Sequence, residues 1–510
     1  MKLSKLKSVL HASNFFKDHQ YWVWLMLFLV FFLGLVGRFY DFKDPPLDFH
    51  PTRQFYSMLM ARGMYYENLE GVPEEKKEQA IIQWKSEAQI EPQIMQRLTA
   101  WGYHLVGSDD LRVPRFLSIL FWTVGAVGLF LVSRDLVGDK GAVIGVAYYM
   151  LLPYTLYASR SFQPEPLMTA AIIWSWWGMV RWVKNRQWVN AVIAGILIGF
   201  AIYVKLPAVF FILPALIGLV LTKYKLRKAI TDPQLILIAL LSILPALIYH
   251  IDGFFISGFL RGQTSLRFFP DLLLDPFHYL SWKDMIDSTL GIEFFLVAVV
   301  GILMIKSKPF RVMFLWVFIG YFLYGTVFDY HIVTHSYYQI PLTPAIGVGL
   351  AACFGTLIEN IKGRKLFALI LIGGVTFFWM AFNFWDARMV LKHSNYADEP
   401  GFYESLGIKL KDYTVVSITP NYGYRLSYWG WKQTINWKSV GDFTMREMAG
   451  VEVDREAEFE KATENSDLFL VTDFEEFNQQ PDVKQFLMET YPIFEEGDGY
   501  LIFDLRESVP

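Results

Sequence analysis

The stretch DFHPTRQ, residues 48–54, follows directly on the first long apolar segment of the chain, which begins near Tyr21. It opens a long polar loop and so places the carboxylate of Asp48 at a membrane surface. An acid at such a boundary is a candidate functional group, because charged side chains next to apolar spans usually have a partner or a function. What Asp48 can do therefore depends on the membrane topology around it.

The composition is that of a polytopic membrane protein. Hydrophobic residues make up 54% of the 510 positions, aromatic residues 17% and charged residues only 19%, which excludes a soluble globular enzyme and a disordered chain. The net charge of −3 gives no reason to expect a nucleic acid partner. The single cysteine, Cys353, lies in an apolar segment, so the chain has no intrachain disulfide and no thiol metal site.

Eleven stretches come close to the length of about 20 apolar residues that a helix needs to cross a bilayer. The apolar run from Tyr21 is too long for the core of a signal peptide, and we expect it to be retained as the first helix. The predicted spans begin near Tyr21, Pro114, Gly141, Glu165, Trp188, Leu206, Gln234, Leu290, Val312, Ile340 and Leu366.

The short loops alternate in their content of lysine and arginine, which is enriched on the cytoplasmic side of membrane proteins. This pattern predicts an inner-membrane protein with a cytoplasmic N-terminus and with the region after Trp385 outside. The basic loops contain Lys2, Lys5 and Lys7; Arg134 and Lys140; Arg181, Lys184 and Arg186; Lys223, Lys225, Arg227 and Lys228; Lys306, Lys308 and Arg311; and Lys362, Arg364 and Lys365.

The long loops all fall on the outer side. The first, residues 41–113, contains amphipathic-looking stretches at 55–69 and 90–106, which we expect to lie in the interface plane and to cover a cavity at membrane level. The predicted fold is therefore mainly α, with about 11 transmembrane helices and outer-face amphipathic helices in a membrane domain of residues 1–385.

The region from 386 to 510 is predicted to form a small soluble α/β domain on the outer face. Strand-like runs at 414–419, 468–472 and 500–504 accompany a helix-like segment at 474–491. Because the domain has no glycine-rich phosphate-binding motif, we assign it no chemistry.

Charged and histidine residues gather at the outer ends of the spans, and none lies in the middle of a span. This distribution indicates one outward-facing site. Its members are Asp48, Glu91, Arg115, Arg160, Glu165, Lys205, Asp329, His331 and His335.

Two carboxylates in the first loop are the candidate catalytic groups. Asp48 is followed by Arg53, and Glu91 recurs before the second amphipathic stretch. Such a pair can serve as base and orienter or can hold a metal. A solvated loop acid or a helix cap is the alternative for Asp48.

The charged residues at the later turns allow a structural and a functional interpretation. Arg160 fits an interfacial side chain reaching toward water, and Glu165 fits a favourable place at a helix N-terminus. Lys205 interrupts an apolar sequence and either binds a phosphate or reaches the lipid headgroups. Arg115 and Lys205 are suited to balance the charge of a lipid phosphate.

His331 and His335 are four residues apart, so on a helix both could ligate a metal. The segment need not be helical, and no third ligand is indicated. Tyr338 in the same segment carries a hydroxyl suited to a phosphate or a sugar. We expect no resident cofactor, with a divalent metal as the alternative.

The order of these residues along the chain resembles the C-fold (GT-C) integral-membrane glycosyltransferases, particularly the branch of the protein mannosyltransferases and the lipid A aminoarabinose transferases. The resemblance spans residues 21–385 and depends on order rather than on a single motif. It is carried by Asp48, Glu91-Pro92, Arg115-Phe116-Leu117-Ser118, Arg160 with Glu165, Val204-Lys205-Leu206-Pro207 and His335-Ser336-Tyr337-Tyr338.

The resemblance implies transfer of a sugar from a polyprenyl-phosphate-linked donor to an acceptor hydroxyl on the outer face, with inversion. Asp48 would be the base, with Lys205, Arg160 and Tyr338 at the phosphate and Glu91 and Glu165 at the sugar or the acceptor. Arg53, Arg115 and His335 complete the expected substrate-binding residues. The acceptor would be a lipid, a glycan or a protein.

The chain departs from the family pattern after both acids. Relatives often have a second acid directly after the first and Lys-Pro-Pro after the loop Glu, whereas Phe49 and His50 follow Asp48 and Pro92-Gln93 follow Glu91. A transporter or lipid flippase and a non-catalytic partner of another glycosyltransferase are the competing hypotheses. Transporter sites lie at the midplane between paired halves, which this sequence lacks.

Overall fold

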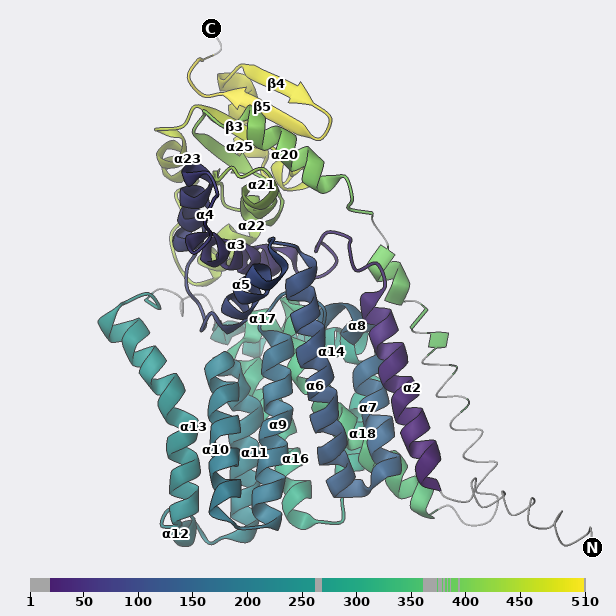
Figure 1. Cartoon of the computed structure of the whole chain (residues 1–510). Helices are drawn as coiled ribbons and strands as arrows, with labels where there is room; N and C mark the ends of the chain where they lie inside the picture. The colour runs from purple at the N-terminus through teal and green to yellow at the C-terminus, as the bar shows by residue number, and fades with distance from the viewer. Residues whose placement is uncertain are drawn as a thin grey trace, which may run out of the picture.

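The computed structural model describes residues 19–261, 268–360 and 395–508, together with single residues and short runs between 374 and 392. Figure 1 shows an upright bundle of long helices, with shorter helices across one end and a small sheet domain above them. The basic residues at 2–7 and 362–365 and the start of the eleventh predicted span at Leu366 lie outside the described residues.

Most predicted spans coincide with a helix of the bundle. The long helices of the bundle are α2 (His19–Phe39), α6 (Arg112–Val137), α7 (Asp139–Leu151), α9 (Glu165–Lys184), α10 (Trp188–Val204), α11 (Val209–Lys223), α13 (Pro233–Ile251), α14 (Pro276–Leu290), α15 (Ile292–Leu303), α16 (Lys308–Val327) and α18 (Thr343–Asn360). Short elements connect them: α8 (Pro153–Ala158), η2 (Leu206–Ala208), α12 (Leu226–Ala229), η3 (Asp252–Ile256), η4 (Pro270–Leu274), α17 (Asp329–Thr334) and η5 (Ser336–Leu342).

The predicted count of eleven spans is not confirmed. Among the described residues, six helical stretches are long and apolar enough to cross a membrane, or seven if α14 and α15 form one bent span. These two helices meet at 88°, at Gly291, whose φ of +76° favours glycine. Likewise, α7 ends at Leu151, two residues before Pro153.

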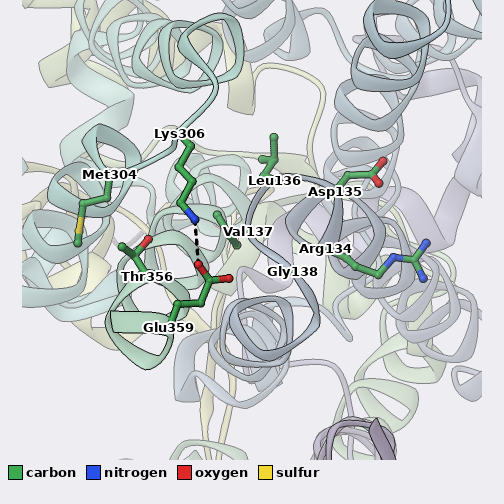
Figure 2. Close-up of a pocket in the computed structure, with 9 residues that line it drawn as sticks. All are labelled: Arg134, Asp135, Leu136, Val137, Gly138, Met304, Lys306, Thr356 and Glu359. Carbon is green, nitrogen blue, oxygen red and sulfur yellow. Dashed lines mark hydrogen bonds and ion pairs between the residues drawn. The ribbon is translucent and has the colours of Figure 1, made fainter. Parts of the chain in front are cut away.

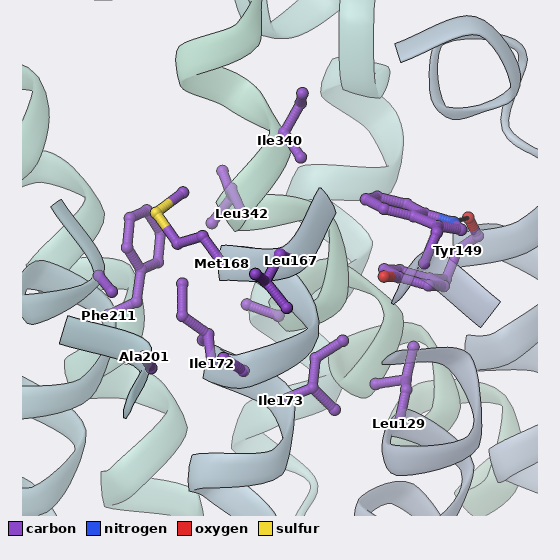
Figure 3. Packing of buried hydrophobic residues seen from close by; sticks show 14 of the residues in the cluster. Leu129, Tyr149, Leu167, Met168, Ile172, Ile173, Ala201, Phe211, Ile340 and Leu342 are labelled. Carbon is purple, nitrogen blue, oxygen red and sulfur yellow. Dashed lines mark hydrogen bonds between the residues drawn. The ribbon is translucent and has the colours of Figure 1, made fainter. Parts of the chain in front are cut away.

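Helix α9 runs through the middle of the bundle and is buried along most of its length. Figure 3 shows Leu167, Met168, Ile172 and Ile173 of this helix packed among apolar side chains of its neighbours. Because its first residue is Glu165, this buried helix fixes the position of a predicted site residue. At the same end of the bundle, the turn that precedes α9 fixes the position of Arg160 in the same way.

Small residues allow the helices of the bundle to approach closely. A methyl group added at Gly320 of α16 would lie 1.8 Å from the carbonyl oxygen of Phe210 in α11, and one at Gly301 of α15 would lie 1.9 Å from that of Gly349 in α18. Close backbone contact of this kind is a main source of helix association in membranes. Cys353 is buried in α18 beside the same crossing.

We predict that Gly320→Ala destabilises the bundle by roughly 1–3 kcal/mol, because the added methyl group has to displace the backbone of α11. The matched control is Gly401→Ala in α20 (Glu399–Lys409), where nothing lies within 4 Å of the new carbon. Thermal unfolding in the same detergent measures both. Equal melting temperatures for the two variants would contradict the close crossing.

The first long loop, residues 41–113, folds into three helices, α3 (Pro51–Glu67), α4 (Glu74–Ser86) and α5 (Ile94–Val106). Two of them coincide with the predicted amphipathic stretches, whereas α4 was not predicted because its first half is almost wholly charged. Helix α3 is buried on all sides between residues 54 and 66. Helix α5 exposes Trp101, Leu105 and Val106. The loop therefore connects the bundle with the domain above it.

The C-terminal domain contains a five-stranded sheet, as the predicted α/β class requires. The strand order is β2-β1-β3-β5-β4, with β2, β1 and β3 parallel and β5 antiparallel to both of its neighbours. Its strands are β1 (Val415–Ile418), β2 (Ile435–Asn436), β3 (Leu468–Val471), β4 (Ile493–Gly497) and β5 (Tyr500–Asp504). The other elements are α20, η6 (Pro420–Gly423), α21 (Tyr424–Trp429), α22 (Val440–Met448), α23 (Arg455–Thr463), α24 (Phe474–Asn478) and α25 (Pro481–Thr490).

The three strand-like runs of the sequence became β1, β3 and β5, which are buried. Strands β2 and β4 were not predicted, because β2 has two residues and β4 is mostly exposed. The helix-like segment at 474–491 is divided into α24 and α25, since Pro481 starts a new helix.

A fully buried arginine of α3 joins the first long loop to the C-terminal domain. Arg62 donates to the carbonyl oxygens of Tyr428 and Ser427, the second at 3.0 Å, and to Oε1 of Gln83 at 2.6 Å. Its guanidinium also lies 4.4 Å from the ring centre of Tyr428 and 3.9 Å from that of Trp431. These contacts fix α21 against α3 and α4.

Candidate active site

Asp48 lies in a buried ion-pair cluster at the end of the bundle that faces the sheet domain. Arg160 donates from Nε and Nη2 to Oδ2 of Asp48, at 3.0 and 2.6 Å. Arg115 approaches the other oxygen, Oδ1, with its Nη2 at 3.5 Å. The side chain of Asp48 is only 4% exposed, and both guanidiniums are buried. Asp48 is therefore held between two cations, and Oδ1 keeps capacity for a further hydrogen bond.

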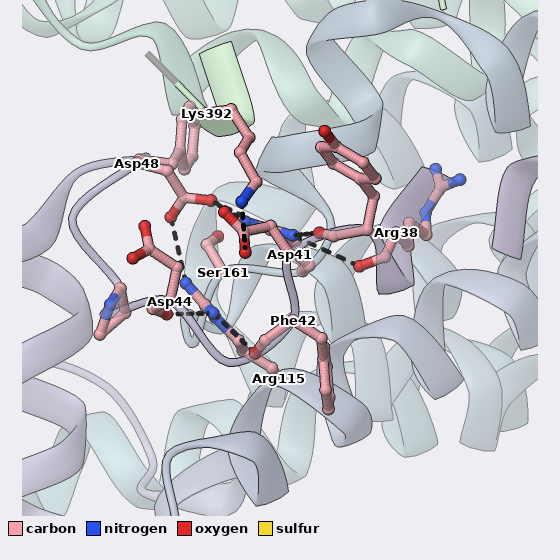
Figure 4. A network of polar contacts seen from close by, with 12 residues as sticks. Arg38, Asp41, Phe42, Asp44, Asp48, Arg115, Ser161 and Lys392 are labelled. Atoms are coloured by element: carbon pink, nitrogen blue, oxygen red, sulfur yellow. Dashed lines mark hydrogen bonds and ion pairs between the residues drawn. The ribbon is translucent and has the colours of Figure 1, made fainter. Parts of the chain in front are cut away.

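The same two arginines hold the backbone of the loop that carries Asp48. Figure 4 shows Arg115 beside this loop. Arg115 donates to the carbonyl oxygens of Phe42, Asp44 and Pro45, and Arg160 donates to that of Tyr40 at 2.6 Å. Guanidinium groups suit this work because they carry five donors in a fixed plane. The loop between α2 and α3 is thus ordered without secondary structure of its own.

Residues close to the start of the C-terminal domain hold this loop from the other side. Oδ1 of Asp44 accepts from the backbone N–H of Tyr396 at 3.2 Å, and Lys392 lies 3.3 Å from Oδ1 of Asp41. Burial raises the pKa of the Asp44 carboxyl, although the hydrogen bond from Tyr396 acts in the opposite direction. Lys392, Tyr396 and the loop of Asp48 therefore form one polar network.

A second cluster contains the remaining predicted acids. Arg53, in the first turn of α3, forms an ion pair of 2.6 Å with Glu91, which is 8% exposed. Lys205, directly after α10, forms an ion pair with Glu165 at the start of α9. The second oxygen of Glu165, Oε2, is buried without a hydrogen-bond partner among the described residues. It remains available for a hydroxyl donor.

Charges balance within this second cluster. Burial alone would lower the pKa of Arg53, but the Glu91 carboxylate outweighs it, so the pKa of Arg53 is raised and the guanidinium stays charged. The ammonium of Lys205 lies 5.5 Å from the ring centre of Tyr337 in η5. Tyr338, the next residue, is buried and stacks on Tyr324 of α16 at 5.3 Å.

Histidines connect the two clusters. His50, two residues after Asp48, adopts φ 42° and ψ 63°, a left-handed conformation that is uncommon for a residue other than glycine. Its Nε2 lies 3.0 Å from Oγ of Ser336, and its ring packs against Tyr337 at 4.8 Å and His335 at 6.1 Å. The strained backbone is thus kept in place by contacts from η5.

The imidazoles of His50 and His335 are both neutral at neutral pH. Burial, together with the positive charge of Arg53, lowers the pKa of His50 and that of His335 to about 4 in each case, and His335 adds to the effect on His50. His331 does lie in a short helix, α17, and its ring is 5.2 Å from that of His335. Among the described residues, no group of three or more His, Cys, Asp or Glu side chains is arranged to hold a metal ion.

The structure brings the predicted residues together in two adjoining groups. Asp48 meets Arg115 and Arg160, while Glu91, Arg53, Glu165, Lys205, His335 and Tyr338 gather around Tyr337. Only five positions of chain separate Asp48 from Arg53.

Sequence reasoning missed several residues of this region. Asp44 was not singled out, and Ser336 and Tyr337 were named only as members of the stretch 335–338. The fully buried Gln163 has neither amide atom hydrogen-bonded among the described residues. An unpaired buried amide calls for an explanation, such as a ligand or a water. The available signal was its place in the polar turn between Arg160 and Glu165.

Two cavities lie away from these groups. One, of about 220 Å³, lies between the ends of α6, α15 and α18 and is drawn in Figure 2, where Lys306 pairs with Glu359 at 3.0 Å. The other, of about 240 Å³, lies between α3 and α5. We place the candidate site at the buried ion pairs, because charges this deep require a function or a compensating partner. The first cavity also shows that the basic loops of Arg134 and Lys306 meet at one end of the bundle.

Part of the chain matches a known sequence family. Residues 91–249, just under a third of the chain, match the family described as dolichyl-phosphate-mannose-protein mannosyltransferase. The matched part contains Glu91, Arg160 and Lys205, whereas Asp48 precedes it and His335 follows it. No curated protein matches the sequence.

Two solved structures illustrate the similarity of the fold. ArnT from Cupriavidus metallidurans bound to undecaprenyl phosphate has a TM-score of 0.53 at 13% identity, covering 95% of this chain and 98% of its own. The Archaeoglobus fulgidus oligosaccharyltransferase with Zn and sulfate has a TM-score of 0.56 at 14% identity, with coverages of 94% and 73%. The resemblance to the C-fold (GT-C) integral-membrane glycosyltransferases is thereby confirmed at the level of the fold.

Proposed function

We propose that this protein is a membrane glycosyltransferase that moves a sugar from a polyprenyl-phosphate-linked donor to an acceptor hydroxyl. The observation that carries the proposal is the group of buried cations and carboxylates at one end of the bundle, where Lys205 pairs with Glu165 and Arg53 pairs with Glu91. An anionic phosphate and a polar sugar require such groups, and a prenyl chain requires the apolar helices beside them.

The proposed reaction is a single displacement with inversion. The acceptor oxygen attacks the anomeric carbon while the bond from that carbon to the phosphate oxygen breaks, and the phosphate keeps the electron pair. Oδ1 of Asp48 takes the acceptor proton, because Oδ2 is already occupied by Arg160. Asp48 thus works as the base while both arginines keep it in position.

In this proposal the phosphate of the donor binds near Lys205, Arg160 and Tyr338, and Arg115 and His335 complete its surroundings. A leaving phosphate gains most from fixed positive charge in a site that excludes water. Glu91 and Glu165 position the hydroxyls of the sugar or of the acceptor, and the unpaired Oε2 of Glu165 supports this assignment.

The proposed setting is the inner membrane, with the N-terminus in the cytoplasm and the C-terminal domain outside. The partners are membrane lipids, the lipid-linked donor and a lipid, glycan or protein acceptor. We assign no resident cofactor, and a divalent metal at His331 and His335 is the alternative that a chelator would reveal.

The test uses purified protein in lipid nanodiscs with a panel of radiolabelled polyprenyl-phosphate sugars, with and without EDTA. We expect one donor to lose its label, either to water or to an added acceptor, and the product to have the inverted anomeric configuration. If every donor stays intact while the protein in vesicles takes up a solute specifically, the protein is a transporter or a flippase instead.

Replacement of Lys205 is predicted to weaken binding of the donor more than any other step of the reaction. Lys205→Met removes the ammonium but keeps a chain of similar length, so we expect the donor KM to rise about tenfold because a charged hydrogen bond is lost. Lys140→Met, in the first turn of α7, is the matched control and should leave the KM unchanged. The initial rate of label loss at increasing donor concentration measures both, and equal KM values would contradict the role of Lys205.

A further inference from the structure

A carboxyl group outside the two clusters stands at the junction of the first long loop and the C-terminal domain. Glu87 follows α4 directly, and its Oε2 accepts from the hydroxyl of Tyr424 in α21 at 2.8 Å. Glu87 and Tyr424 are both half-buried and therefore within reach of a bound molecule. Neither residue is used in the proposed reaction.

This junction is continuous with the candidate active site. Asn421, in the turn before Tyr424, donates to Oγ1 of Thr52 at 3.2 Å, and the next residue, Arg53, pairs with Glu91. On the other side, the hydroxyl of Tyr56 donates to the carbonyl oxygen of Ala88 at 2.5 Å, between Glu87 and Glu91. A molecule at Glu87 would thus extend directly toward the donor site.

The turn that presents Tyr424 has an unusual backbone. Asn421, Tyr422 and Gly423 all have φ between 58° and 74°, and the turn follows the carboxyl end of β1. Ligands of open parallel sheets bind at such carboxyl ends, where connections leave in opposite directions. The connections diverge in this way at β1, because β1 leads to β2 on one side while β3 lies on the other.

The chemistry of the junction favours a cationic guest. The positive groups nearby are committed, since Arg53 pairs with Glu91 and Lys205 pairs with Glu165. Glu87 has the neutral phenol of Tyr424 as its hydrogen-bond partner and no ion pair among the described residues. A half-buried carboxyl group without a counter-ion binds an ammonium group more strongly than a neutral one.

We propose that Glu87 and Tyr424 form an acceptor subsite, which binds an ammonium group carried next to the hydroxyl that receives the sugar. This inference rests on the proposed function and names the chemical class of the acceptor. Glu87 binds the ammonium, and Tyr424 keeps the carboxylate in position. The reacting hydroxyl then points toward Asp48 and the donor.

The preference of the subsite for an ammonium group should depend on pH. Burial raises the pKa of Glu87 to about 7, even though the hydrogen bond from Tyr424 acts in the opposite direction. Groups that face this region from the neighbouring elements are Tyr56 and Arg53 of α3, Glu91 of the loop and Tyr424 of α21. Because the carboxyl loses its charge as the pH falls through 7, the preference for an ammonium should fall as well.

A competition between two small acceptors tests the proposal. Ethanolamine and ethylene glycol have the same size and each offers a hydroxyl, but only ethanolamine carries an ammonium. Both are added in equal amount to the enzyme in nanodiscs with the donor that the panel identifies, and mass spectrometry measures the ratio of the two products. We expect the wild-type protein to favour ethanolamine by about tenfold at pH 8, and less at pH 6.

The variants decide the assignment. Glu87→Gln should remove the preference and its pH dependence, and Tyr424→Phe should reduce the preference, while hydrolysis of the donor by water stays at the wild-type rate. Controls are Glu78→Gln, on the exposed side of α4, and Tyr413→Phe, whose hydroxyl lies outside the junction.

Each result has a distinct meaning. An equal ratio in the wild-type protein and in Glu87→Gln would overturn the subsite, as would donor hydrolysis without transfer to either probe. A donor that is not consumed at all would instead overturn the proposed function, so the two failures are distinguishable.

Discussion

Asp48→Asn is expected to lower the rate of sugar transfer about 100-fold to 10,000-fold, the range that a positioned general base contributes. The amide keeps the shape of the side chain and a contact for Arg160, but it cannot accept a proton from the acceptor. The effect should appear in kcat, because the donor phosphate binds to other residues. Initial rates in nanodiscs at saturating donor measure it.

The control for this variant is Asp41→Asn in the same loop. Asp41 forms an ion pair with the half-exposed Lys392, and exposed pairs contribute little, so transfer should stay close to the wild-type rate. Because Asp48 also balances two buried guanidiniums, thermal unfolding of Asp48→Asn has to accompany the kinetics. A folded Asp48→Asn protein with full activity would exclude Asp48 as the base and would point to a non-catalytic partner of another transferase.

Arg62→Ala should have the largest effect on the arrangement of the domains. The change removes three hydrogen bonds and two contacts with aromatic rings. It leaves Oε1 of Gln83 and the carbonyl oxygen of Tyr428 without this donor, whereas the carbonyl oxygen of Ser427 keeps its hydrogen bond from Nε2 of Gln83 at 3.0 Å. We expect a loss of roughly 2–6 kcal/mol at the junction, because each of two buried neutral acceptors left unpaired costs about 1–3 kcal/mol. Hydrogen exchange at residues 427–431 should then increase strongly.

Arg455→Ala is the matched control for Arg62, because Arg455 is exposed and its ion pair with Glu447 lies on the surface. Exchange at 427–431 should be unchanged in that variant. Limited proteolysis offers a second readout, since a released C-terminal domain would be cut from the bundle sooner. If Arg62→Ala exchanges at the control rate, the interdomain contact does not depend on this arginine.

The helices of the bundle could be predicted from the sequence because hydropathy is a local property. The positions at which segments begin, such as Trp188 and Glu165, agree with the structure. The number of spans could not be predicted, because breaks at Pro153 and Gly291 depend on how each short helix packs. Apolar content alone does not separate a buried half-span from a complete one.

The sequence could predict which residues belong to the candidate site, but not which of them pair with one another. Charge at the ends of apolar segments singled out Asp48, Arg115 and Arg160, because such charge is costly. That Arg160 would bind Asp48, 112 positions away, requires the fold. Glu87 carried no signal at all, since its neighbours in the sequence are polar and its partner Tyr424 belongs to another domain.

Cys353, buried in α18, makes this protein a convenient subject for spectroscopy. It is the single cysteine of the chain and is 8% exposed, so water-soluble thiol reagents should scarcely reach it. A cysteine introduced at a chosen surface position would carry practically all of the label. Spin labels at one position on α5 and one on α25 would then report whether the two move apart during turnover, without prior removal of native thiols.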